Sequence, residues 1–112
     1  MRIYKIMSRA DWAAAQAAGR YEGSAVDRAD GFIHFSTGPQ AQETARRHFA
    51  GQGELVVLAV ETTSFGAALR WEPSRGGDLF PHLYGALDTA KVVEVREAPL
   101  GPDGTPVVGE LP

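Results

Sequence analysis

The apolar stretch LVVLAV, residues 55–60, is the feature of the sequence that decides the fold. A nearly unbroken apolar run of this length is typical of a β-strand whose two faces are both covered by other parts of the protein. Such a strand lies inside a sheet and has a neighbour on each side. We therefore predict that residues 55–60 form the central strand of the sheet.

The N-terminal segment predicts a strand followed by a helix. Residues 2–7 alternate in the manner of a strand. Ser8, with Asp11 three positions later, resembles a capping box, and the alanine-rich run that follows has a high helix propensity until Gly19 ends the helix. Residues 20–30 are polar and contain glycine, which predicts a loop.

The stretch GFIHFST, residues 31–37, follows this loop and is predicted to be a second strand. Thr37 and Gln40 then form a Thr-x-x-Gln capping box, which predicts a second helix ending before Gly51. Both predicted helices therefore lie in the N-terminal half of the chain, before the central strand in the sequence.

The segment after the central strand predicts further strands and few helices. The stretch LRWEPSRGGDLFPHLYGAL, residues 69–87, indicates two short strands around a Gly-Gly turn. Residues 91–96 indicate a half-buried strand in which Val93 and Val95 alternate with charged residues. The tail, residues 98–112, is rich in proline and glycine and is either a terminal hairpin or a flexible end. The order of elements predicts an α+β fold.

The composition limits the classes of function. A chain of 112 residues suits a single domain, residues 1–112, and 0 cysteines exclude disulfides, thiolate zinc sites and cysteine nucleophiles, which favours the cytoplasm. No segment has the apolar run of a signal peptide or a membrane span. A net charge of −3 with interspersed acids and bases provides no basic surface for extended nucleic acid, while a nucleotide ligand is compatible with it.

Polar side chains recur at alternate positions in three of the predicted strands. Alternate residues of a strand share a face, so the candidate residues fall into three sets. The sets are Phe32, His34 and Ser36; Phe80, His82 and Tyr84; and Arg70, Glu72 and Ser74, the last set lying opposite Trp71 and Pro73. If these faces line one cleft, the site suits anion binding and general acid or base chemistry.

Each candidate also has a structural interpretation. A single histidine in an apolar strand is often a core residue with a hydrogen-bond partner, which describes His34 equally well. Arg70 and Glu72 would then form a surface ion pair of small energetic effect. No His-x-His or His-Glu-x-x-His pair occurs, so we predict no metal site.

Two stretches of the chain resemble a known family. DGFIHFST, followed by a helix containing glutamine, and LRWEPSRGGDLFPHLYGAL are similar to the two signatures of the bacterial domain-of-unknown-function family 952. The resemblance extends from the first strand to about Arg96. It implies a fold like that of the ADP-ribosyltransferases, in which split and curved small sheets surround a cleft that holds NAD in the catalytic families.

The resemblance also implies roles for individual residues. His34 matches a histidine that orients the ribose of NAD and Ser36 matches a hydroxyl residue, while Phe35 stands where those relatives have glycine. The RNA 2'-phosphotransferase, a relative in the same fold class, uses basic residues instead. Arg70 and His82 would suit a phosphate-handling variant of this kind.

We expect a cytoplasmic protein that binds NAD or an ADP-ribose-like nucleotide, and the sequence leaves open whether it is an enzyme and how many copies assemble. The alternatives are a peptide- or protein-binding module, a phosphate-handling enzyme like the 2'-phosphotransferase, and a small hydrolase. NAD is the one cofactor that the resemblance implies. The candidate catalytic residues are His34, Glu72 and His82, and the candidate ligand-binding residues are Ser36, Thr37, Arg70, Trp71 and Tyr84.

Overall fold

The computed structural model describes residues 1–112 of the chain, with the exception of the side chain of Arg75. The helices are α1 (Arg9–Ala18), α2 (Ala25–Asp30) and α3 (Gly38–His48). The strands are β1 (Arg2–Ser8), β2 (Arg20–Tyr21), β3 (Ile33–His34), β4 (Leu55–Glu61), β5 (Leu69–Pro73), β6 (Leu79–Leu83), β7 (Leu87–Asp88) and β8 (Val92–Glu97). Short 3-10 helices link the later strands and span Thr62–Ser64, Gly66–Ala68, Arg75–Gly77 and Thr89–Lys91.

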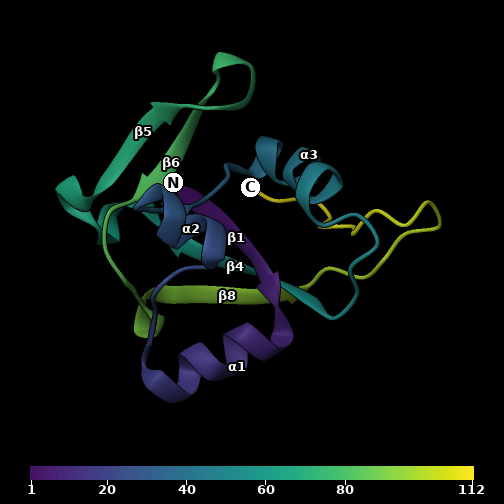
Figure 1. The fold of residues 1–112 in the computed structure, drawn as a ribbon, viewed down its shortest axis with the longest axis horizontal. Helices are drawn as coiled ribbons and strands as arrows, with labels where there is room; N and C mark the ends of the chain where they lie inside the picture. The colour runs from purple at the N-terminus through teal and green to yellow at the C-terminus, as the bar shows by residue number, and fades with distance from the viewer.

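The strands form three small antiparallel sheets, and their order confirms the predicted α+β class. The sheets are ordered β1-β4-β8, β2-β7 and β3-β6-β5. Figure 1 labels the strands of the first sheet and the β5-β6 pair of the third. Within the described part of the chain, no helix is long and apolar enough to cross a membrane.

The predicted central strand is confirmed as β4, which pairs with β1 on one side and β8 on the other. All six residues of LVVLAV are buried. Val56, Leu58 and Val60 belong to the core cluster on the α1 side, while the alternate residues join the cluster that includes α3 (Figure 1). A fully buried valine or leucine side chain contributes about 1.5–3 kcal/mol, so this strand supplies much of the driving force for folding.

The helix boundaries confirm the capping patterns. The Ser8 hydroxyl accepts a hydrogen bond from the Asp11 amide at 3.0 Å, and α1 ends at Gly19, whose φ of 82° is in the left-handed region that favours glycine. At α3, the Gln40 amide donates to the Thr37 hydroxyl and the Thr37 amide donates to the Gln40 side chain. These are the two halves of a capping box.

The loop predicted for residues 20–30 is wrong, because this segment contains β2 and the short helix α2. Ser24 and Asp27 form a reciprocal capping box at the start of α2. The six-residue helix is too short for apolar periodicity to reveal it. The capping pattern alone could have indicated it, since Ser24-x-x-Asp27 repeats the Ser8-x-x-Asp11 pattern that marks α1.

The strand predicted for residues 31–37 is shorter than expected, and the chain changes sheets within it. β3 holds only Ile33–His34, which pair with β6. The Phe35 amide still donates to the Pro81 carbonyl at 3.0 Å, but Ser36 instead exchanges hydrogen bonds with Tyr4 of β1, at 2.7 and 2.9 Å. The GFIHFST stretch therefore joins the β3-β6-β5 sheet to the β1-β4-β8 sheet.

The alternation predicted for β8 is present, but the valines occupy the exposed side. Val93 and Val95 are 50% and 43% exposed, whereas Glu94 and Arg96 are partly buried. Ion pairs explain this choice, because Glu94 accepts from Arg2 at 3.1 Å and lies 3.1 Å from Arg96. β8 is an edge strand of its sheet, where charged side chains are common.

The C-terminal tail returns to the body of the protein. Leu100 and Pro106 form an antiparallel bridge around a turn, and Val108 is buried in the cluster that includes α3. The Tyr4 hydroxyl donates to the Pro112 carbonyl at 3.0 Å. The tail thus covers α3 and the start of β1.

A substitution at Gly38 tests how closely this tail packs against α3. A Cβ at Gly38 would collide with the backbone carbonyl of Leu111. We expect Gly38→Ala to lower the free energy of unfolding by about 1–3 kcal/mol, the usual cost of overpacking, as measured by urea denaturation. Gly53→Ala is the matched control, because a Cβ there meets only an ordinary contact with Leu100. Equal stability of the two variants would contradict close packing of the tail.

Candidate functional site

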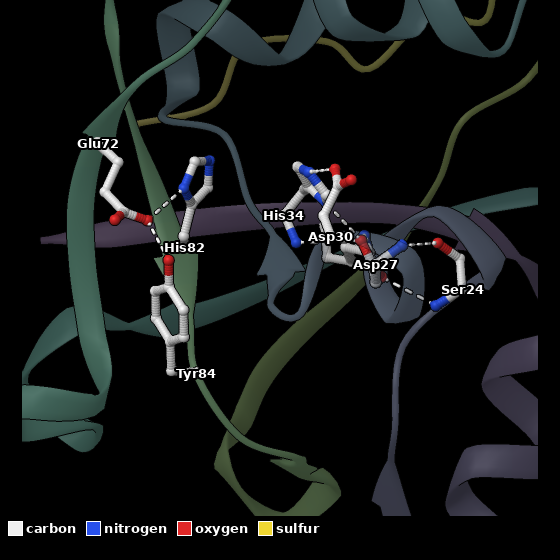
Figure 2. A network of polar contacts seen from close by, with 8 residues as sticks. Ser24, Asp27, Asp30, His34, Glu72, His82 and Tyr84 are labelled. Carbon is white, nitrogen blue, oxygen red and sulfur yellow. Dashed lines mark hydrogen bonds and ion pairs between the residues drawn. The ribbon is translucent and has the colours of Figure 1, made fainter.

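The polar faces of β3, β6 and β5 meet on one side of their sheet. His34 lies directly opposite His82, and Arg70 lies opposite His82 on the other side. Cross-strand partners of an antiparallel sheet share a face, so the register brings the three side chains together. The centroids of the two imidazole rings are 5.4 Å apart. The candidate site is therefore a set of neighbouring side chains (Figure 2).

His82 is oriented by a carboxylate. Its Nδ1 lies 2.8 Å from Glu72 Oε1, and the Tyr84 hydroxyl donates to the same oxygen at 2.7 Å. The hydrogen bonds from His82, which has the larger effect, and from Tyr84 lower the pKa of the Glu72 carboxyl. The bond to Glu72 raises the pKa of the Tyr84 hydroxyl. The Arg70 guanidinium lies 4.5 Å from the centre of the Tyr84 ring and favours the ionised carboxylate nearby.

His34 lies between two carboxylates of helix α2. Its Nδ1 is 2.6 Å from Asp27 Oδ1, and its Nε2 is 2.9 Å from Asp30 Oδ2. Figure 2 shows His34 pointing toward these two residues, on the side away from Glu72. Both contacts are hydrogen bonds only when each ring nitrogen carries a proton.

Phe32 packs against both histidines. Its ring is stacked on that of His82 at 4.0 Å and tilted against that of His34 at 4.7 Å. The Tyr84 ring is 5.2 Å away on the same side. Strand alternation predicts Phe32 on this face, but its contact with both imidazoles was not predicted. The aromatic contacts hold both imidazoles in fixed orientations.

Asp27 organises the site, and the sequence did not indicate it. Its carboxylate is 2% exposed and contacts Lys5 Nζ at 2.9 and 3.1 Å. The backbone amides of Ser24 and His34 also donate to it, at 2.9 and 3.2 Å. Burial alone would raise the pKa of this carboxyl. The hydrogen bond from His34, the Lys5 charge and the Ser24 amide outweigh burial and hold the pKa well below its ordinary value.

A cavity of about 500 Å³ opens beside these residues, between β1, α2, α3 and β6. Its lining includes His34, His82, Ser36 and the carboxylates of α2. The His82 ring is almost wholly buried, at 4% exposed, and among the described residues its Nε2 has no hydrogen-bond partner. A volume of this size accommodates a small organic molecule.

The remaining candidate residues are placed differently from one another. Ser36 lines the cavity and its hydroxyl contacts that of Thr44 at 3.0 Å. The Thr37 hydroxyl caps α3. Trp71 lies on the opposite face of β5 from Glu72 and is 39% exposed. Neither Thr37 nor Trp71 lines the cavity. The described residues contain no cluster of three metal-ligating side chains.

The burial of the Lys5–Asp27 pair leads to a prediction about the stability of the fold. We expect Asp27→Asn to lower the free energy of unfolding by about 3–5 kcal/mol, because it leaves the Lys5 charge buried without a counterion. Adding Lys5→Met removes that charge and should restore part of the loss, as measured by urea denaturation. A double variant no more stable than Asp27→Asn would contradict this account.

Acidification tests the same pair. Because the pKa of Asp27 is lower in the folded protein than its ordinary value, its ionised form stabilises the fold above about pH 4, and this stabilisation is lost as the pH falls further. The stability difference between the natural chain and the Asp27→Asn, Lys5→Met variant should therefore shrink between pH 5 and pH 2. Glu43, whose pKa Arg46 and Arg47 lower to about 2, is present in both chains and cancels. A difference that is constant with pH would refute the assignment.

Comparisons with known proteins confirm the family that the two sequence signatures indicate. The family model described as protein of unknown function (DUF952) matches residues 6–95. The crystal structure of protein CC0527 from Caulobacter crescentus is 57% identical, with a TM-score of 0.95 over 97% of this chain and 96% of that one. The solution structure of CC0527 is 58% identical, with a TM-score of 0.86 over 94% and 90% of the two chains. No curated protein matches the sequence. The chain belongs to the DUF952 family of proteins of unknown function.

Proposed function

We propose that this protein binds a small ligand with a sugar and a phosphate, such as NAD or an ADP-ribose-like nucleotide, in the cavity beside His34 and His82. The observation that carries the proposal is the buried His82 ring, whose Nε2 has no hydrogen-bond partner among the described residues. A buried polar atom without a partner costs about 1–3 kcal/mol. A ligand group that donates a hydrogen bond to this nitrogen would recover that cost.

The surroundings of the cavity suit a ligand that is partly polar and partly aromatic. His34 and Ser36, the residues that the resemblance to the ADP-ribosyltransferases associates with a ribose, are both in the lining. Phe49 and Phe80 supply apolar surface in the same cavity. Small-molecule sites commonly combine an apolar wall with a few fixed polar groups.

The proposal is one of binding by a cytoplasmic protein, with a chemical role for the Glu72–His82 pair as its extension. A carboxylate that holds Nδ1 of a histidine and leaves Nε2 toward a ligand is an arrangement that general bases use. The 2.8 Å contact from Glu72 to His82 supplies that orientation. A phosphate-handling activity would use the same residues.

Thermal unfolding in the presence of candidate ligands tests the proposal. NAD, ADP-ribose, adenosine 3'-monophosphate, adenosine 5'-monophosphate and inorganic phosphate are added separately at millimolar concentration. A ligand at a hundred times its Kd stabilises the fold by about 2.7 kcal/mol, so we expect at least one nucleotide to raise Tm by several degrees. If none of the probes raises Tm, nucleotide binding is refuted.

Two variants locate the binding. His82→Asn keeps a donor where Nδ1 meets Glu72 but removes Nε2, so we expect it to lose most of the ligand-induced rise in Tm. Trp71→Ala is the matched control, because Trp71 lies on the other face of the same hairpin and should leave the rise unchanged. An unchanged rise in His82→Asn would place the ligand elsewhere.

A further inference from the structure

We infer that His34 and His82 are a recognition pair of opposite protonation, a cationic donor beside a neutral acceptor, that selects a phosphate ester with a free hydroxyl on the neighbouring carbon. A ribonucleoside 3'-phosphate has this arrangement. The inference rests on the proposed function, since it assigns the ligand class for the same cavity.

His82 is the acceptor of the pair. Its Nδ1 donates to Glu72, which already accepts from the Tyr84 hydroxyl. The tautomer is therefore the one with a proton on Nδ1, and Nε2 presents a lone pair. A proton on Nε2 would find no acceptor among the described residues, because the nearby carboxylates of α2 are bound to His34 and Lys5.

His34 is the donor of the pair. Carboxylates at 2.6 and 2.9 Å face both of its ring nitrogens, which calls for a proton on each. The two carboxylates differ in exposure, because the Asp27 side chain is 2% exposed and the Asp30 side chain is 48% exposed. A ligand anion can therefore take the place of Asp30 at Nε2, while Asp27 keeps Nδ1 fixed.

The two rings together restrict which ligands can satisfy both of them. A phosphate satisfies the charge of His34 but offers no proton to His82, and a hydroxyl donates to His82 but does not neutralise His34. The ring centroids are 5.4 Å apart and both residues line one cavity. Groups on neighbouring carbons are close enough to meet both rings at once. Lys5 is already paired with Asp27, and Arg70, which packs on the Tyr84 ring, does not line the cavity.

Three ligands that differ by one group test this class. Adenosine 3'-monophosphate has the neighbouring hydroxyl, 2'-deoxyadenosine 3'-monophosphate lacks it, and adenosine 5'-monophosphate has no hydroxyl on the adjacent carbon. By calorimetric titration, we expect the first to bind about tenfold more tightly than each of the others, which is the effect of one hydrogen bond to a buried acceptor. Equal affinities for all three would overturn the inference.

Protein variants assign the two contacts separately. In His82→Asn the preference for the ribonucleotide over its 2'-deoxy analogue should disappear, because the acceptor is gone. In Asp30→Asn both 3'-monophosphates should bind at least threefold more tightly, because the phosphate no longer competes with a carboxylate. Glu22→Gln removes an exposed charge that does not line the cavity and is the control for net charge. If His82→Asn keeps the preference for the ribonucleotide, or if Asp30→Asn gains no more affinity than Glu22→Gln, the recognition pair is refuted.

Nitrogen chemical shifts of the free protein test the pair without a ligand. ¹⁵N-resolved spectra at neutral pH should show His82 protonated on Nδ1 only and His34 protonated on both nitrogens. A proton on His82 Nε2, or a neutral His34, would overturn the inference even if NAD binds. If NAD or ADP-ribose binds but the three monophosphates bind equally well, the inference is overturned and the proposed function stands. If no probe binds, the proposed function is refuted as well.

Discussion

The buried carboxylate of Asp27 is the contact on which the geometry of the site depends. It connects β1 through Lys5, the start of α2 through the Ser24 amide, and β3 through both the backbone and the ring of His34. A charge buried to this extent persists only when it is paired and fully hydrogen-bonded. The same group that makes the region costly to assemble therefore also fixes His34 relative to the rest of the sheet.

The second constraint is the change of sheet within GFIHFST. The pairing of β3 with β6 sets the two histidines opposite each other, and the pairing of Ser36 with Tyr4 attaches that small sheet to the larger one. Phe35 is buried where the chain crosses between them. The cavity lies at this junction, so its walls come from segments that are far apart in the sequence.

The sequence predicted the elements whose signals are local or strongly apolar. LVVLAV indicated the central strand, Thr37 and Gln40 indicated the start of α3, and strand alternation put His82 and Glu72 on one face. It could not show that the three polar faces meet, because meeting depends on the register between strands. It also missed Asp27, whose importance comes from Lys5, a partner 22 positions earlier in the chain. The orientation of β8 was decided by Arg2, which is likewise remote in sequence.

The two tryptophans occupy contrasting environments, and this gives the protein an intrinsic optical probe. Trp12 is buried against the core, while Trp71 stands half in solvent on the back of the strand that carries Glu72. Emission from Trp71 will therefore lie to the red of emission from Trp12, and a Trp12→Phe chain would report from the β5–β6 hairpin alone. Movement of that hairpin, with the carboxylate that orients His82, would be visible as a change in fluorescence without any attached label.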